Sequence, residues 1–327
     1  MLPIGITRDG AFTLASANPD DYVLIPGQLP EVEDNGTRII WPDSAHSNEL
    51  WLSGDGPDRS LGNVDVVFPI LHGPYGEDGT IQGMLELYGL PYVGSGVLAS
   101  SLGMDKHFTK TVLQAAGIEV APWRTIKRYD WHKRPQAIRA MAEQMSLPVF
   151  VKPARAGSSV GVGKVSNWNE FAQAMDEAFL EDDHVLIEAG IVGREVECAV
   201  LQGMPGEPTR ASVAGEIVVS GRDFYDFEAK YLGAEGIDLV CPAQLSTDEL
   251  AELQRLSIRA FEAIGGAGLA RVDFFLTETG FVLNEINTMP GFTPISMFPR
   301  CWQETGLSYS DLIDELIQVA LAHHAED

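Results

Sequence analysis

The sequence predicts an α/β protein built from three lobes, and three observations support this fold class. In the first third, the β-branched run at 64–71 and the short run at 90–93 alternate with helical apolar spacing at 79–89. Two β segments, at 149–153 and 160–165, flank a glycine-rich stretch. A β-hairpin is predicted at 270–287. The first observation indicates an open parallel sheet, and the other two indicate mixed α+β packing.

The remaining elements follow from apolar periodicity along the chain. In segment 168–180, for example, Phe171, Ala174, Met175 and Ala178 fall on one helical face. No internal repeat or low-complexity linker occurs. We expect lobes at 1–105, 106–188 and 189–327. One helix is predicted to begin at about Leu98, and further helices are predicted at 106–117, 168–180, 247–264 and 308–323. Strands are predicted at 184–188, 194–201 and 213–219, and a loop at 220–235.

Composition restricts the function classes. The 327 residues include 22 Lys and Arg against 47 Asp and Glu, a net charge of −25, and 45% of them are hydrophobic. The apolar content excludes a disordered chain, and the charge argues against binding nucleic acid or an anionic membrane. The N-terminus lacks a signal-peptide pattern, and no apolar stretch is long enough to span a bilayer. We therefore expect a cytoplasmic protein whose Cys198, Cys241 and Cys301 are reduced thiols.

The glycine-rich stretch at 152–163 has the composition of a phosphate-binding flap. Its glycines allow backbone N–H groups close to an anion, its serines add donors, and Lys152 adds positive charge. The stretch does not fit the P-loop register, and its flanks are strands where a P-loop would open a helix. A glycine-rich surface hairpin is the alternative interpretation, and this motif alone does not exclude it.

A second glycine motif, at 94–99, matches the dinucleotide-binding fingerprint, with Glu119 about the expected distance beyond it. The preceding strand is weak, and Glu119 follows a predicted helix rather than ending a strand. We therefore do not assign a dinucleotide site.

The hairpin at 270–287 predicts a metal site. Arg271 and Asp273 share one face of the first strand, and Glu285 and Asn287 share one face of the second. If Asp273 pairs with Glu285 across a turn centred on Thr279, all four side chains point into one site. Carboxylate and amide oxygens suit Mg²⁺ or Mn²⁺ and argue against zinc. A solvated polar hairpin is less favoured because the opposite face is crowded with Phe, Val and Leu.

The segment at 224–232 combines aromatic residues with a single lysine, Lys230, in a long predicted loop. It has the composition of a lid that closes on substrate, and equally that of an ordinary surface loop. Residue chemistry alone does not choose between them.

Taken together, these motifs resemble the D-alanine–D-alanine ligase family of the ATP-grasp superfamily. Five segments carry the resemblance in the family's order over nearly the whole chain: 72–79, 104–106, 152–161, 227–231 and 284–293. The resemblance implies a three-lobed ATP-grasp architecture, with an N-terminal open parallel α/β sheet and α+β packing in the two ATP-grasp lobes. It also implies an ATP-dependent ligase that joins two D-alanines through an acyl phosphate for peptidoglycan synthesis. Its cofactors would be ATP and two Mg²⁺ (or Mn²⁺) ions, and the protein would form a homodimer.

The resemblance also implies roles for particular residues. Arg271 and the Gly291 amide would form an oxyanion hole, and Ser158 and Tyr231 would be catalytic. The residues implied to bind ATP are Lys106, Lys152, Ser158, Ser159, Val160, Glu188, Ala189, Ile191, Glu195, Tyr225, Lys230 and Asn284. Those implied to bind D-alanine are His72, Gly73, Ser296 and Met297, and the implied metal ligands are Asp273, Glu285 and Asn287. Tyr231 favours D-alanine over D-lactate as the second substrate.

Two positions depart from the family pattern. Residue 1 aligns with the family's second strand, so about one βα unit, with a glutamate that would bind the first D-alanine, is missing from this sequence. Either the true start lies upstream of Met1, or the sheet lacks an inner strand and the site lacks that carboxylate. Ala189 and Gly190 follow Glu188 where a longer side chain is expected. The first departure leaves open a catalytically weak ATP-binding protein, or another ATP-grasp ligase, as alternatives.

Overall fold

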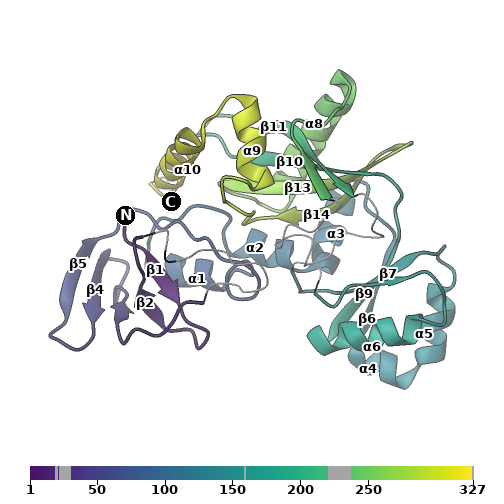
Figure 1. Cartoon of the computed structure of the whole chain (residues 1–327), viewed down its shortest axis with the longest axis horizontal. Helices are drawn as coiled ribbons and strands as arrows, with labels where there is room; N and C mark the ends of the chain where they lie inside the picture. Colours follow the sequence, from purple (N-terminus) through teal and green to yellow (C-terminus); the bar gives the residue numbers. More distant parts are fainter. Residues whose placement is uncertain (19–20, 22–30, 158–159, 220–236, 326–327) are drawn as a thin grey trace. The chain divides into compact units, whose positions relative to one another are not determined.

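A computed structural model of the chain describes residues 1–18, 21, 31–157, 160–219 and 237–325 (Figure 1). These residues form two compact units. One consists of Met1–Val67 with Met84–Tyr92, and the other of Phe68–Gly83 with Val93–Asp327. Helix α1 (Thr80–Leu87) begins in the second unit and ends in the first.

The smaller unit is built from two short antiparallel sheets. Its core is formed by Ile39, Leu50 and Leu52. Trp41 stacks on Tyr88 with 6.1 Å between ring centroids, which secures the sheet against the helical segment of the same unit. The sheets are a hairpin of β1 (Ile4–Ile6) and β2 (Phe12–Leu14) and a meander of β3 (Arg38–Ile40), β4 (Glu49–Ser53) and β5 (Arg59–Asn63).

The mixed α/β class is confirmed, but the extent of the predicted N-terminal parallel sheet is corrected. Within the described residues, segment 64–71 contributes one parallel bridge, Val67 to Tyr92, where the Val67 N–H donates to the Pro91 carbonyl at 2.8 Å. Pro69 has no N–H to continue a ladder, and Ile70 is 58% exposed. A β-branched run therefore gave a half-exposed extended segment rather than a buried central strand.

The second unit contains a four-stranded antiparallel sheet in the order β6-β9-β7-β8. The predicted strand pair around the glycine-rich stretch is confirmed, with Val149 opposite Val165. Three helices cover one face of this sheet, and Phe171 and Met175 supply part of the core (Figure 1). The elements are β6 (Trp123–Lys127), β7 (Val149–Pro153), β8 (Gly163–Val165), β9 (His184–Ala189), α4 (Arg128–Lys133), α5 (Pro135–Ala142) and α6 (Phe171–Glu181).

The same unit contains a five-stranded antiparallel sheet in the order β12-β11-β10-β13-β14. Apolar side chains on one face of it pack with three helices into the largest core cluster. The longest of these helices begins at a capping box formed by Ser246 and Glu249. The elements are β10 (Arg194–Leu201), β11 (Arg210–Val219), β12 (Ile237–Val240), β13 (Leu269–Thr277), β14 (Gly280–Asn287), α2 (Val97–Met104), α3 (Lys106–Ala115) and α8 (Thr247–Ala263).

Helices α9 (Met297–Thr305) and α10 (Tyr309–His324) complete the unit. Met297 of α9 lies against Gly215 of β11, where an added Cβ would stand 2.1 Å from the Met297 sulfur. The neighbouring Ala214 belongs to the core cluster that α8 covers. Because successive strand residues point to opposite faces, α8 and α9 lie on opposite faces of the five-stranded sheet.

Candidate active site

The hairpin of β13 and β14 has the predicted register. Asp273 is opposite Glu285, Arg271 is opposite Asn287, and the strands close at Thr277 and Gly280. Directly opposed residues of an antiparallel pair point to the same face, so these polar side chains share one site.

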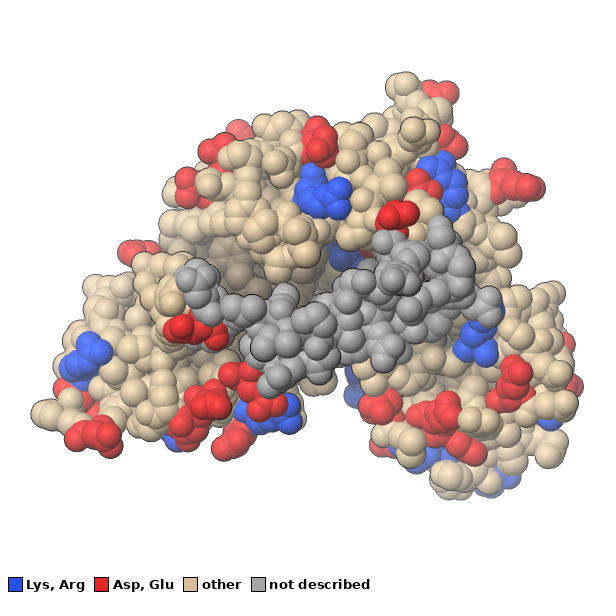
Figure 2. All heavy atoms as spheres, in the orientation of Figure 1, with Lys and Arg blue, Asp and Glu red and all other residues tan. Residues whose placement is uncertain are grey.

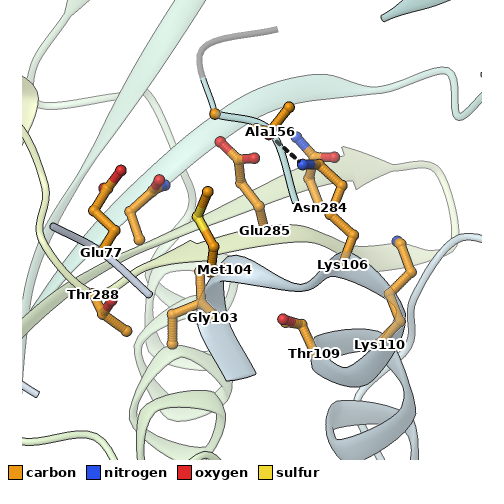
Figure 3. Close-up of a pocket in the computed structure, with 13 residues that line it drawn as sticks. Glu77, Gly103, Met104, Lys106, Thr109, Lys110, Ala156, Asn284, Glu285 and Thr288 are labelled. Carbon is orange, nitrogen blue, oxygen red and sulfur yellow. Dashed lines mark hydrogen bonds between the residues drawn. The ribbon is translucent and has the colours of Figure 1, made fainter. Parts of the chain in front are cut away.

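A β-bulge next to this pair adds a residue to the site. The register shifts between Asp273 and Phe274, which leaves Asn284 as the extra residue of β14. A bulge makes two residues of one strand oppose one residue of its partner, so neighbouring side chains can turn toward the same side. Asn284 and Glu285 accordingly line the same pocket (Figure 3).

Arg271 connects the acidic side chains of this face. Its Nε and Nη2 donate to the two oxygens of Asp273 at 2.8 and 2.7 Å, and the Asn287 amide donates to Asp273 at 3.0 Å. Burial works against the charge of Arg271, but Asp273 and Glu197 together raise its pKa well above the usual value. The guanidinium is therefore a fixed cation at the centre of the site.

Glu197 is a member of this site that motif reasoning missed. It lies on β10 directly opposite Asp273, so Glu197, Asp273 and Glu285 form a row across three strands. Glu197 is 3% exposed, and its Oε2 lies 3.3 Å from Nε of Arg271. The sequence signal was a glutamate alternating with apolar residues in a strand that is otherwise buried.

The donor chemistry of this face fits a divalent cation that prefers oxygen ligands. Asp273 is 3% exposed and directly opposed to Glu285, and Asn287 adds an amide to the same face. Among the described residues, no group of three or more His, Cys, Asp or Glu side chains has the spacing of a metal site. A site here would therefore combine the two carboxylates with the amide oxygen, a set of hard ligands.

An open pocket lies beside this face. Lys106, at the start of α3, extends into it and donates from Nζ to the Ala156 carbonyl at 2.7 Å (Figure 3). Carboxylates and lysines thus face one another across the pocket, whose lining consists of Glu77, Gly103, Met104, Lys106, Thr109, Lys110, Ala156, Gly157 and 284–288.

A buried charge cluster lies behind the pocket. Glu188 accepts contacts from Lys152 at 2.8 Å and from Lys110 at 2.9 Å, and all three side chains are at most 16% exposed. Burial opposes the charge of Glu188, but Lys152 and then Lys110 lower its pKa to about 2. Lys110, whose side chain is 2% exposed, was not predicted as a site residue. The outer surface contrasts with this cluster, because acidic and basic side chains are scattered over the face shown in Figure 2.

Glu77, within the 72–79 motif, also lines the pocket without having been predicted. It accepts a hydrogen bond from the Gly73 amide, which fixes the motif's turn. Burial is the main reason that the pKa of Glu77 rises to about 7, and the nearby charge of Glu285 raises it further.

The predicted D-alanine residues occupy two places. Ser296 is the N-cap of α9 and its Oγ accepts from the Thr293 amide at 3.0 Å, and Met297 is the first residue of the helix. Gly291 approaches Ser296 closely, because a Cβ added to Gly291 would lie only 3.1 Å from the Ser296 Oγ. His72 is exposed and lies beside Gly73 in the turn that Glu77 holds.

Some of the remaining predicted ATP ligands lie among the described residues and others do not. Ala189 ends β9, Ile191 follows it in the connection to β10, and Glu195 lies at the start of β10. Val160 is 41% exposed. Glu195 and Glu197 share one face of β10. The predicted residues Ser158, Ser159, Tyr225, Lys230 and Tyr231 lie outside the described residues.

Comparison with family models decides the family. The model described as "D-ala D-ala ligase C-terminus" matches residues 112–318, and the one described as "D-ala D-ala ligase N-terminus" matches residues 1–95. The chain belongs to the D-alanine–D-alanine ligase family.

Members of this family among curated proteins match nearly the whole chain. A D-alanine–D-alanine ligase of Pseudarthrobacter chlorophenolicus is 47% identical over 98% of this chain and 85% of its own length. Another, of Paenarthrobacter aurescens, is 48% identical over 98% of this chain and 86% of its own length. The chain thus spans 85–86% of the length of these two relatives. The match of the N-terminal family model to residues 1–95 disfavours the weak ATP-binding protein and the other ATP-grasp ligase as alternatives.

Solved structures of D-Ala ligases share the ATP-grasp fold of this chain. The VanG D-Ala:D-Ser ligase from Enterococcus faecalis has a TM-score of 0.82 and 34% identity, covering 98% of this chain and 89% of its own. The D-alanine–D-alanine ligase from Coxiella burnetii has a TM-score of 0.78 and 35% identity, covering 99% and 84%. The family uses ATP, a divalent metal and small-molecule substrates. No helix among the described residues is long and apolar enough to cross a membrane.

Proposed function

We propose that this chain ligates two D-alanines to D-alanyl-D-alanine, using ATP and forming an acyl phosphate, for peptidoglycan precursor synthesis. The single observation that carries the proposal is the site on the β13–β14 hairpin: Asp273 is paired with Glu285, Arg271 is bound to Asp273, and a pocket lined by lysines lies beside them. A family member with this arrangement has both the oxygen ligands and the fixed cation that the reaction needs.

ATP phosphates would be bound by lysines in the pocket and next to it. The chain has a net charge of −25, so a polyanion needs a local group of cations to bind. Lys106 and Lys152 are the described candidates, with Lys230 and the flap residues Ser158, Ser159 and Val160 proposed from the resemblance. Adenine and ribose would be held near Glu188 and at Ala189, Ile191 and Glu195, and Tyr225 and Asn284 complete the proposed ATP ligands.

Asp273, Glu285 and Asn287 would hold two Mg²⁺ or Mn²⁺ ions. When bound, the ions supply charge stabilisation on the phosphate oxygens. The role of this chain's residues is to keep three oxygen-bearing side chains on one face of a rigid hairpin, since phosphoryl transfer depends mainly on positioning and electrostatics.

Arg271 would stabilise the negative charge that develops during ligation. The first D-alanine carboxylate attacks the γ-phosphate and displaces ADP, and the amine of the second attacks the carbonyl carbon of the resulting acyl phosphate, from which phosphate leaves as the amide bond forms. A tetrahedral oxyanion forms in that second attack, and a pre-positioned guanidinium together with the Gly291 amide would bind it. His72 and Gly73 would contact the first D-alanine, and Ser158 and Tyr231 would assist proton transfer.

The second D-alanine would place its carboxylate at the N-terminus of α9. Ser296 and Met297 lie there, and the free N–H groups of a helix N-terminus favour an anion. Tyr231 supports D-alanine rather than D-lactate as the acceptor. The family resemblance further supports a homodimer of three-lobed subunits divided at 1–105, 106–188 and 189–327, and dependence on ATP supports a cytoplasmic location.

The test is phosphate release from ATP and Mg²⁺ by the purified chain, with and without D-alanine, followed by product analysis. The expected result is release that depends on D-alanine and yields the dipeptide. The variant Arg271→Met should lose at least a hundredfold in kcat, because removal of one oxyanion donor costs about 3–4 kcal/mol. Nucleotide binding without D-alanine-dependent release would favour a weak ATP-binding protein. Preferential use of D-serine or D-lactate would show that D-alanine is not the preferred second substrate.

A further inference from the structure

Two cysteines from distant parts of the sequence meet beside the proposed acceptor site. Cys241 follows β12, and Cys301 lies within α9. Their sulfur atoms are 3.7 Å apart, and both are free thiols. The third cysteine, Cys198, has its sulfur 3.7 Å from the Ser212 carbonyl and is fully buried. The proposed ligation chemistry uses none of these thiols.

The two thiols differ in their access to solvent. Cys241 is partly exposed, whereas Cys301 is 1% exposed. Cys241 therefore meets a dissolved oxidant first, and Cys301 is shielded from solvent. The hydrogen-bond contact with Cys301 lowers the pKa of Cys241 against the opposing effect of burial, and the charge of Arg300 lowers it further. The accessible thiol is thus also the more reactive one.

We propose that Cys241 and Cys301 form a reversible redox site that closes to a disulfide in the presence of a peroxide. The Cys241 thiolate attacks one peroxide oxygen, the O–O bond breaks, and water leaves after protonation. The Cys301 sulfur then attacks the sulfenic sulfur of Cys241, and a second water leaves. In total, two thiols and one H₂O₂ give one disulfide and two H₂O. A thiol reductant reverses the reaction by thiol–disulfide exchange.

Closing the disulfide requires a small movement of α9. A disulfide has sulfur atoms about 2.05 Å apart, so the two sulfurs must approach by roughly 1.7 Å. Cys241 is anchored at the end of β12, where Val240 pairs with Glu216. Cys301 is attached to α9, whose Thr305 hydroxyl accepts from the Val213 amide at 3.0 Å. The approach therefore pulls one helix toward the sheet on which it already rests.

The movement reaches the proposed acceptor site because Cys301 and Met297 lie four residues apart on one face of α9. Met297 is packed on Gly215 and cannot move closer to the sheet at that point. The helix must therefore tilt or shift at its N-terminus, where Ser296 and Met297 would bind the second D-alanine. This consequence, which rests on the proposed function, predicts that oxidation raises the KM for D-alanine roughly tenfold and changes the KM for ATP less.

Thiol counting on the intact chain tests the disulfide independently of activity. After treatment with H₂O₂, alkylation under denaturing conditions should find one thiol instead of three, and peptide mapping should link Cys241 to Cys301. Cys198→Ser is the matched control and should keep the disulfide, whereas Cys241→Ser and Cys301→Ser should each lose it. Three remaining thiols, or a linkage through Cys198, would overturn the proposal.

Kinetics on the same samples test the link to the acceptor site. The KM for D-alanine should rise on oxidation, return with dithiothreitol, and stay constant in Cys241→Ser. A disulfide that forms without any change in KM overturns that link. An absence of D-alanine-dependent turnover in the reduced chain contradicts the proposed function. Thiol counting and peptide mapping still show in that case whether the disulfide forms.

Discussion

Glu197 lies directly opposite Asp273 on the neighbouring strand, is 3% exposed, and has its Oε2 3.3 Å from Nε of Arg271. Its carboxylate partly neutralises a guanidinium that also holds both oxygens of Asp273. We predict that Glu197→Gln lowers kcat about tenfold, since losing a charged hydrogen-bond partner costs on the order of 1–3 kcal/mol. Arg271 would then bind Asp273 more strongly and become less available to a developing oxyanion. Steady-state kinetics with D-alanine measure this.

The control for Glu197→Gln is Glu252→Gln, a surface glutamate of α8 paired with Arg255 three residues away. Surface pairs of this kind contribute little, so its kinetics should match the parent chain. If Glu197→Gln leaves kcat unchanged while folding normally, Glu197 does not position Arg271. A substitution that lowers thermal stability alone would show a structural role only.

Lys110, which lines the pocket, shares the buried Glu188 with Lys152. When Lys152 turns to bind a phosphate, Lys110 is the cation that remains to compensate the buried carboxylate. We predict that Lys110→Met lowers the free energy of unfolding by about 3 kcal/mol, because breaking a buried pair leaves charge uncompensated. It should also raise the KM for ATP, since Glu188 would then retain Lys152.

A double-mutant cycle separates these two effects. Adding Glu188→Gln to Lys110→Met removes the buried charge and should recover part of the lost stability, measured by urea unfolding. Strict additivity of the two substitutions would show that Lys110 and Glu188 are not coupled.

At the scale of elements, the contact between β11 and α9 depends on the absence of a side chain at Gly215. A Cβ there would stand 2.1 Å from the Met297 sulfur, and Met297 is itself 4% exposed, so its side chain has little room to move away. We predict that Gly215→Ala displaces the N-terminus of α9 and raises the KM for D-alanine more than the KM for ATP. Gly206→Ala is not a suitable control, because Gly206 has a positive φ of 83°. Gly56→Ala is better, since Gly56 is exposed, an added Cβ there meets nothing within 4 Å and its backbone is not left-handed.

Elements whose partners are close in sequence were the ones that residue patterns predicted well. The pairing of Asp273 with Glu285 followed from strand alternation and a short turn, because a hairpin fixes its own register. The strand pair of β7 and β8 and the helices α8 and α10 were predicted for the same local reasons.

Features that depend on tertiary partners could not be predicted in this way. Residues 64–71 have the composition of a buried strand, yet a strand needs neighbours on both sides, and a run of residues does not show whether they exist. Glu197 and Lys110 enter the site through strand pairing and helix packing across long sequence separations. Their sequence signal was only that a charged residue stood among buried ones.

At the scale of the whole molecule, acid should destabilise the fold through its buried carboxylates. Burial opposes the charged form of Glu188 and of Asp182. The pKa of Glu188 is nonetheless lowered from 4.5 to about 2 by Lys152 and Lys110, and that of Asp182 is lowered mainly by its hydrogen bond with Arg155. A carboxyl whose pKa is lower in the folded chain stabilises the fold fully above its unfolded pKa, and that contribution is lost as the pH falls toward the folded value. The folded state should therefore lose stability between about pH 4.5 and 2.

Thermal unfolding across this range measures the effect, and Glu188→Gln isolates one group. The variant is expected to be less stable than the parent at pH 7, because two buried lysines then lack their carboxylate. The difference in stability between the two proteins should shrink as the pH falls. Protonation removes the charge of Glu188 from the parent chain, whereas the variant has no carboxylate at this position to protonate. A constant difference from pH 7 to pH 3 would mean that Glu188 does not titrate in this window, and that the ion cluster behind the pocket does not govern acid stability.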